Sequence, residues 1–80
     1  FNRVVQCFLN KIFKTNLKID GLIGDKTKEL VSRYQSSKGM YPVDGIFGGD
    51  TRSKMTPEEK KIWKSCVREQ GDFIDRIVGI

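Results

Sequence analysis

Histidine is absent from the 80 residues of this chain, which removes the commonest general base and the commonest metal ligand in proteins. A serine triad or a cysteine–histidine pair therefore cannot be built from these residues. Only two cysteines occur, Cys7 and Cys66, and they lack the spacing of a zinc site. We expect no cofactor and no metal, and the residues leave open whether the two cysteines are buried free thiols or a disulfide.

Long hydrophobic runs are also missing. No apolar stretch approaches the roughly 18 residues that cross a bilayer, so we expect no membrane span and no secretory leader. Because the chain starts at Phe1 rather than at methionine, we expect a piece of a longer protein. Eighty residues allow one small core, and a single monomeric domain is expected.

Positive charge is concentrated in the first half of the chain. Residues 1–40 carry eight basic and three acidic side chains, whereas residues 41–80 carry seven of each sign. A basic half suggests an anionic partner, such as a wall polymer, a nucleic acid or lipid headgroups. A solvated surface without a partner explains the same pattern, so this choice stays open.

Two segments of the sequence repeat at an offset of 24 residues, LKIDGLIGDKT at 17–27 and YPVDGIFGGDT at 41–51. Asp-Gly favours a turn, because glycine adopts positive φ freely and aspartate can accept from nearby backbone N–H groups. The shared residues therefore indicate a structural motif in which each turn launches a helix. They are Asp20 and Asp44, Gly21 and Gly45, Gly24 and Gly48, and Thr27 and Thr51.

Details of each repeated turn follow from the same reasoning. The two apolar residues after Asp-Gly are expected to point inward, and Asp25 and Asp50 are expected to cap the helices that follow. The aspartates Asp20 and Asp44 are expected to fix their own turns rather than to act as an acid–base pair. Calcium is not expected, because the loops lack the spacing and the final glutamate of a calcium-binding loop.

Apolar spacing predicts helices over about 3–14 and about 26–37, with a short helical turn near 50–55. Asn2 is expected to cap the first helix and Gly39 to end the second. Thr56-Pro57-Glu58-Glu59 is the strongest helix start, Gly71 can end that helix, and Asp72 can cap a last one. The predicted fold is all-α: a small three-helix bundle with two Asp-Gly-x-x-Gly loops in residues 1–55. One or two C-terminal helices in residues 56–80 extend the same domain.

These motifs together resemble the peptidoglycan-binding domain found in bacterial and phage cell-wall hydrolases, over about residues 3–55. The matching segments are Val5-Gln6 and Leu9-Asn10 in the first helix, Asp20 to Thr27, Tyr34-Gln35 in place of Phe-Gln, and Asp44 to Thr51. Residues 57–78 are more loosely similar to the helical extension of such domains in phage muramidases. That second similarity rests on Val67-Arg68 and on Phe73 to Val78, which two added amphipathic helices explain equally.

The resemblance implies a non-catalytic module that binds peptidoglycan, with anionic wall polymers as a further partner, and anchors an attached lytic hydrolase such as a muramidase or endolysin. It would work at the bacterial cell wall or in the periplasm, after secretion or release by a bacteriophage. Two alternatives stay open. One is a small basic helical nucleic-acid-binding domain, and the other is a muramidase fragment with its own chemistry on Glu29, Glu58, Glu59 or Glu69.

Sugar rings dock on exposed aromatic side chains and are held by amides, hydroxyls and carboxylates. The cationic side chains of Arg33, Lys18 or Lys38 could meet stem-peptide carboxylates or anionic wall polymers. The candidate ligand-binding residues near the repeated loops are Asn16, Arg33, Tyr34, Gln35 and Tyr41. Tyr34 shares an apolar helix face with Leu30 and Val31, so a place in the core competes with ligand binding. A contact with Pro42 competes in the same way for Tyr41.

Overall fold

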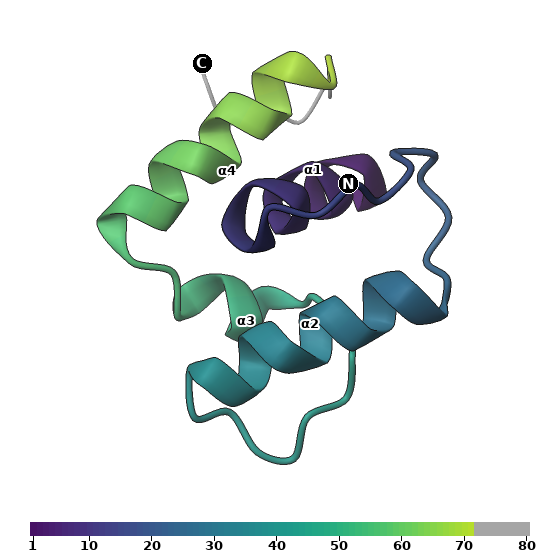
Figure 1. Cartoon of the computed structure of the whole chain (residues 1–80). Helices are drawn as coiled ribbons and strands as arrows, with labels where there is room; N and C mark the ends of the chain where they lie inside the picture. The colour runs from purple at the N-terminus through teal and green to yellow at the C-terminus, as the bar shows by residue number, and fades with distance from the viewer. Residues whose placement is uncertain (72–80) are drawn as a thin grey trace.

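The computed structural model describes residues 1–71, and it is all-helical within that range, as the sequence predicts. Its four helices are α1 (Asn2–Phe13), α2 (Asp25–Ser37), α3 (Gly49–Ser53) and α4 (Pro57–Glu69). Helix α1 lies between α4 and α2 and packs against both (Figure 1). None of these described helices has the length and apolar content that a membrane crossing needs. The segment expected from Asp72 onward, with Phe73 to Val78, lies outside the described residues.

Aromatic side chains from three helices and the second repeated loop form the centre of the core. Phe8 is fully buried and meets Tyr34, Phe47 and Trp63 edge-on, with ring centroids 5.6, 5.8 and 5.6 Å away. Phe47 and Trp63 are stacked at 5.3 Å. Such ring pairs contribute about 1 kcal/mol each beyond the area that they bury. Residues of α1, α2 and α4 and the second loop therefore share one core.

A disulfide joins α1 to α4. Cys7 and Cys66 are both buried, and their Cα atoms are 5.7 Å apart, a normal separation for this bond. Lys11 and Glu69 form an ion pair between the same two helices. The structure therefore resolves the choice between free thiols and a disulfide, and the first helix of the chain is covalently fixed to the last described one.

Helix α4 begins as its sequence predicts. The Thr56 hydroxyl accepts a hydrogen bond from the Glu59 backbone N–H at 3.2 Å, and the Glu59 carboxylate accepts one from the Thr56 N–H at 2.8 Å. Pro57 occupies the first helical position, where its missing N–H costs nothing. This reciprocal capping box satisfies two backbone donors that the helix itself leaves free.

The other caps predicted within residues 1–71 are wrong. Asn2 lies inside α1, where its side-chain amide donates to the Gly21 carbonyl at 3.0 Å instead of capping the helix. Asp25 and Asp50 lie in the first turns of α2 and α3, after the extended residues Gly24 and Gly48, which take the cap position. Neither carboxylate makes a cap hydrogen bond, although negative charge in a first turn is favourable to the helix dipole.

The two long helices of the repeated region end differently. Helix α1 is followed by Lys14, whose φ of 54° and ψ of 47° are left-handed, and residues other than glycine adopt this conformation at a cost of about 1 kcal/mol. Helix α2 is followed by Gly39 at φ 71°, and α4 by Gly71 at φ 61°. The predicted stops at Gly39 and Gly71 are thus confirmed, whereas the end of α1 depends on a strained lysine.

Candidate ligand-binding site

The first repeated turn is held by one buried side-chain amide from α1. The Gln6 carbonyl oxygen accepts from the backbone N–H groups of Asp20 and Gly21 at 3.1 and 2.9 Å. The Gln6 amide nitrogen donates to the Asp20 carboxylate at 3.2 Å and to the Leu22 carbonyl at 2.8 Å. The carboxylate also accepts from the Leu22 N–H at 2.9 Å. We call Gln6 with residues 20–22 the first turn lock.

The second repeated turn is held in the same way by Gln35 of α2. Its carbonyl oxygen accepts from Asp44 and Gly45 N–H at 3.2 and 3.1 Å, and its nitrogen donates to the Asp44 carboxylate and the Ile46 carbonyl at 2.8 and 2.9 Å. The same nitrogen also donates to the Thr51 hydroxyl at 3.1 Å. Gln35 with residues 44–46 and Thr51 forms the second turn lock.

Both aspartates of the locks are stabilised as carboxylates. The Leu22 N–H, then the Gln6 amide, hold the pKa of Asp20 below its usual value of 3.8. The Ile46 N–H and then Gln35 lower the pKa of Asp44 in the same way. Because each carboxylate accepts bonds from its own turn, the repeated Asp-Gly motif organises the loops in this structure.

Of the two apolar residues after each Asp-Gly, the first is exposed to solvent and the second is at least half-buried. Leu22 and Ile46 are 72% and 65% exposed, whereas Ile23 is half-buried and Phe47 is 6% exposed. The expectation that both members of each pair point inward is therefore wrong for the first member. The backbone of that residue is bonded on both sides to the lock, through its N–H and its carbonyl, and its side chain is left facing solvent.

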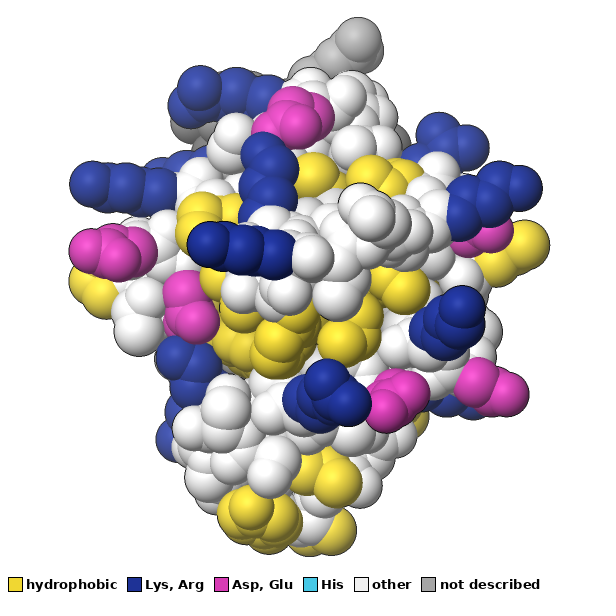
Figure 2. All heavy atoms as spheres, in the orientation of Figure 1, with side chains coloured by type: hydrophobic (Ala, Val, Ile, Leu, Met, Phe, Trp, Pro, Cys, Tyr) yellow, Lys and Arg dark blue, Asp and Glu magenta, His cyan; other side chains and the backbone are white. Residues whose placement is uncertain are grey.

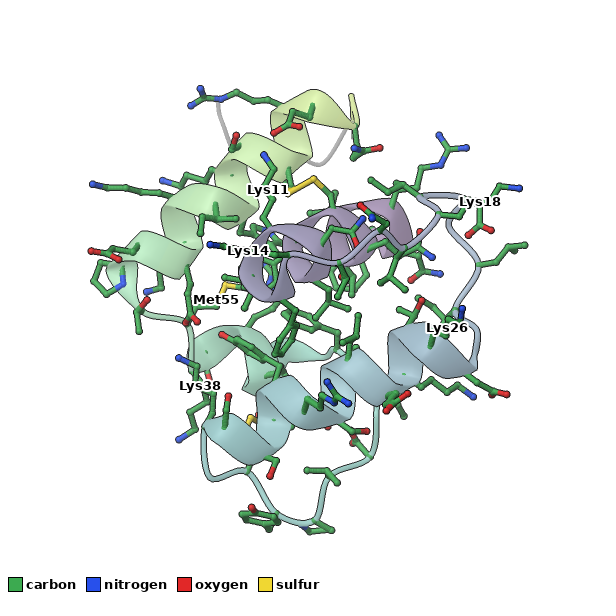
Figure 3. The ribbon with its side chains drawn as sticks, in the orientation of Figure 1. Lys11, Lys14, Lys18, Lys26, Lys38 and Met55 are labelled. Atoms are coloured by element: carbon green, nitrogen blue, oxygen red, sulfur yellow. A yellow bond between two sulfur atoms is a disulfide. The ribbon has the colours of Figure 1, made fainter. Side chains whose placement is uncertain are left out.

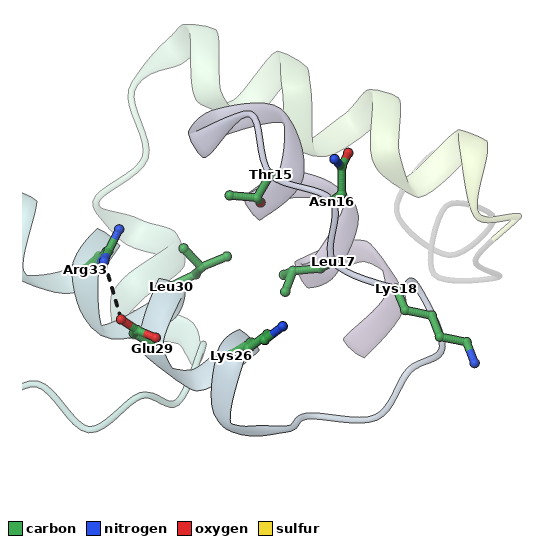
Figure 4. Close-up of a pocket in the computed structure, with 8 residues that line it drawn as sticks. All are labelled: Thr15, Asn16, Leu17, Lys18, Lys26, Glu29, Leu30 and Arg33. Carbon is green, nitrogen blue, oxygen red and sulfur yellow. Dashed lines mark hydrogen bonds and ion pairs between the residues drawn. The ribbon is translucent and has the colours of Figure 1, made fainter.

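A groove opens between the segment that follows α1 and the first half of α2 (Figure 4). It has a volume of about 630 Å³, and we call it the α2 groove. Figure 4 shows the side chains of Leu17 and Leu30 facing one another inside it. The residues that line the groove are Thr15, Asn16, Leu17, Lys18, Lys26, Glu29, Leu30 and Arg33.

Asn10 of α1 holds one wall of the α2 groove. Its side-chain oxygen accepts from the Leu17 N–H at 2.7 Å and from the Thr15 hydroxyl at 2.9 Å, and its nitrogen donates to the Leu17 carbonyl at 3.0 Å. A single amide thus fixes the backbone that follows α1, as Gln6 fixes the turn after it. The groove wall is held by the domain itself.

The region that contains both turn locks and the α2 groove matches a known family. The model of the peptidoglycan binding domain family matches residues 3–55, about two thirds of the chain. The chain belongs to the peptidoglycan binding domain family. No match was found among curated proteins or among solved structures. Membership identifies a cell-wall binding module whose partner is peptidoglycan, in a family of binding domains rather than enzymes.

Two of the five candidate residues of this peptidoglycan-binding domain meet in the α2 groove. Asn16 and Arg33 are exposed there, beside Lys18. Tyr41 is 72% exposed but belongs to the loop after α2, where its hydroxyl lies 2.9 Å from that of Ser36. Figure 3 shows Lys18 and Lys26 at one end of the molecule, with Lys38 at the other end of α2.

Tyr34 and Gln35 of the peptidoglycan-binding domain lie inside it. They are 1% and 3% exposed, so neither side chain is presented to a polymer at the surface. The Tyr34 hydroxyl donates to Glu59 at 3.0 Å, and burial followed by this contact raises the tyrosine pKa above its ordinary value. The competing interpretation of Tyr34 as a core residue agrees with this position, and Gln35 serves the second turn lock.

Most glutamates considered for catalysis are engaged in contacts within the peptidoglycan-binding domain. Glu29 pairs with Arg33 at 3.4 Å, and Glu69 pairs with Lys11. Glu59 joins the capping box, Tyr34 and Lys38, whose amine is 2.8 Å away. Burial raises the pKa of Glu59, but these partners outweigh burial and leave the pKa below its usual value. These carboxylates thus have structural partners.

A cluster of potential metal ligands, Cys7, Cys66 and Glu69, lies where α1 meets α4. The two sulfurs are bonded to each other, and a metal would need thiolates instead. On the face drawn in Figure 2, Lys and Arg side chains are scattered, some at the edge and some beside the hydrophobic side chains of the middle, and they do not gather into one basic patch.

The α2 groove contains residues that sequence reasoning missed. Thr15, Leu17, Lys26 and Leu30 line it, but none carries a pattern that separates a groove from an ordinary helix surface. Asn10 appears in the sequence analysis only as part of the family resemblance, without a structural role. The signal that would have pointed to the groove is the pairing of a side-chain amide on α1 with a short polar segment after the helix.

Proposed function

We propose that this chain is a non-catalytic module that holds an attached lytic hydrolase, such as a muramidase or endolysin, on peptidoglycan. The observation that carries the proposal is the family match over residues 3–55, which spans both turn locks. A glycosidase needs two carboxyl groups placed around the scissile bond. In residues 1–71, Asp20, Asp44, Glu59 and Glu69 are instead engaged in contacts of the fold.

Anchoring has a clear physical benefit for an enzyme that cleaves an insoluble polymer. Tethering converts each encounter of the catalytic domain with the wall into a local event at high effective concentration. The module itself breaks no bond in this proposal. Its place of action is the bacterial wall or periplasm, reached by secretion or by phage release, and the disulfide between Cys7 and Cys66 suits such an oxidising environment.

Co-sedimentation tests the binding half of the proposal. The 80-residue chain is mixed with purified, acid-stripped sacculi at low and high salt, with DNA as a competitor and an unrelated small basic protein as control. We expect this chain to pellet at both salt concentrations and DNA not to release it. If the chain remains in the supernatant, or if DNA removes it from the sacculi, wall binding is refuted, and release by DNA would favour the nucleic-acid alternative.

A fusion experiment tests the anchoring half. The chain is joined to a muramidase that lacks a wall-binding module, and lysis of intact sacculi is compared with cleavage of soluble wall fragments. We expect faster lysis of sacculi and unchanged cleavage of the fragments, because tethering helps only on the insoluble substrate. Equal acceleration on both substrates, or on neither, would refute an anchoring role.

A further inference from the structure

We propose that the α2 groove binds the stem peptide of peptidoglycan, a short acidic peptide rich in alanine methyl groups. The inference rests on the proposed function and assigns it a place and a chemistry. The groove combines cations, one anion and two facing leucines. Each of these features has a counterpart in such a peptide, and the neutral glycan strand offers no counterpart for the charges.

Charge in the groove is arranged in two groups. Lys18 and Lys26 lie toward one end, and the Arg33–Glu29 pair lies toward the other (Figure 4). Within residues 1–71 the Lys26 amine makes no hydrogen bond or ion pair, so its charge is available to a ligand. The lining carries three positive charges and one negative charge, which suits a ligand with more carboxylates than ammonium groups.

The apolar part of the groove favours a peptide over a phosphate polymer. Leu17 is half-buried and Leu30 is 8% exposed, and their side chains face one another. Alanine methyl groups can cover the exposed part of Leu17 while carboxylates reach the lysines. A chain of glycerol phosphates supplies the charge but little apolar surface, so it would leave that part of Leu17 uncovered.

Both walls of the groove are in place before a ligand arrives. Asn10 fixes residues 15–17 through three hydrogen bonds, and Leu30 anchors its part of α2 in the core. A groove that is already formed loses little conformational entropy on binding. Its volume of about 630 Å³ lies within the range of about 300–1,000 Å³ that is usual for ligand sites.

Two matched charge reversals test the assignment. Lys26→Glu changes the groove, and Lys60→Glu makes the same change near the start of α4, outside the groove. Both lysines are exposed and lie early in helices of 13 residues, so both variants should fold, because an acidic residue there suits the helix dipole. Lys18→Glu, in the loop, is a second groove variant, and thermal unfolding checks the fold of all three.

The readout is the dissociation constant of a soluble disaccharide-tetrapeptide, measured by calorimetric titration. We expect Lys26→Glu to weaken binding by about tenfold or more, which corresponds to the loss of one charged contact, and Lys60→Glu to leave it within about twofold. The free tetrapeptide should compete. A neutral disaccharide of N-acetylglucosamine, and a glycerol phosphate oligomer, should not.

Several results would overturn the assignment. These are equal affinities of the wild-type chain and both groove variants, equal losses in Lys26→Glu and Lys60→Glu, or equal binding of the neutral disaccharide. Competition by the glycerol phosphate oligomer would assign the groove to an anionic wall polymer instead. If sacculi pellet the wild-type chain and the groove variants equally, only this inference fails. If they do not pellet the wild-type chain at all, the proposed function fails with it.

Discussion

The two turn locks use the same chemistry in different surroundings. In each, a glutamine amide accepts from two backbone N–H groups and donates to an aspartate and to a carbonyl. The sequence separation between glutamine and aspartate is 14 in the first lock and nine in the second. The lock therefore depends on the geometry of one amide against one Asp-Gly turn and tolerates a change in the loop between them.

What differs is the depth of each lock. Gly45 is buried, and a Cβ there would lie 3.3 Å from the Ser32 hydroxyl, whereas a Cβ at Gly21 would lie 3.6 Å from the flexible side chain of Arg3. The second lock also continues into Phe47, which stacks on Trp63. Both glutamines are buried, so the difference lies in the turns: Gly45 is packed into the core, whereas Gly21 lies nearer solvent.

Replacing each glutamine with alanine should give the largest difference in stability between the two locks. Gln35→Ala leaves the buried Gly45 N–H and the Thr51 hydroxyl without their partner, and we expect a loss of about 3 kcal/mol in the free energy of unfolding. Gln6→Ala should cost about 1.5 kcal/mol, because water can replace the amide at the partly buried first turn. Urea unfolding measures both losses.

Gln70→Ala, at the end of α4, is the control for the glutamine pair and should change stability by less than about 0.5 kcal/mol. Equal losses for Gln6→Ala and Gln35→Ala would contradict the difference in depth.

The glycines of the two turns give a second, smaller contrast. Both have positive φ, 78° at Gly21 and 70° at Gly45, so alanine costs about 1 kcal/mol at either position through the backbone alone. At Gly45 the contact with Ser32 and with the Lys28 backbone adds to this cost, and we expect a total of about 2 kcal/mol. Chemical denaturation of the two variants measures the difference.

Gly24, where a Cβ would meet open space and φ is negative, serves as the control for the glycine pair. A larger loss at Gly21 than at Gly45 would reverse the comparison.

Lowering the pH should produce the smallest difference between the two turns. Both aspartates have a folded-state pKa below the usual 3.8, so their stabilisation is complete above that value and is lost as pH falls through the lower folded-state pKa. The double variant Asp20→Asn/Asp44→Asn should therefore lose less stability per pH unit in acid than the wild-type chain. The pKa values of Glu59 and Glu69 are also lowered, and these two carboxylates should account for the remaining pH dependence.

The Asp44→Asn change should contribute more to the shallower slope, because Gln35 donates to Asp44 at 2.8 Å and Gln6 to Asp20 at 3.2 Å. Thermal melts between about pH 2 and pH 6 measure the slope. An unchanged slope in the double variant would show that the turn carboxylates do not titrate as described.

Local patterns predicted much of the fold. Apolar spacing located the helices to within about two residues, and the Thr56 capping box and the stop at Gly39 follow from local chemistry. Features that depend on contacts between distant segments were missed or left open. The Cys7–Cys66 bond needs α1 beside α4, and the outward direction of Leu22 needs the lock from Gln6.

The candidate site was less predictable than the fold. Asn16 and Arg33 were selected because of their chemistry and do lie in one groove. The same criterion selected Gln35, whose amide is used inside the protein. A side-chain amide that can hydrogen-bond to a sugar can equally hydrogen-bond to a backbone turn, so residue type alone does not distinguish the two roles. The presence of a glutamine before both repeated turns is the sequence feature that would have indicated the second role.

The covalent link between α1 and α4 makes the folded population of this domain depend on its redox environment. It closes a loop with a sequence separation of 59 residues that encloses both repeated Asp-Gly turns. In the chain-entropy description, such a closure removes about 4 kcal/mol of unfolded-state freedom, a large share of the roughly 5–15 kcal/mol that stabilises a typical small domain. The same chain would therefore spend far more of its time unfolded, and open to proteases, in a reducing environment than in an oxidising one.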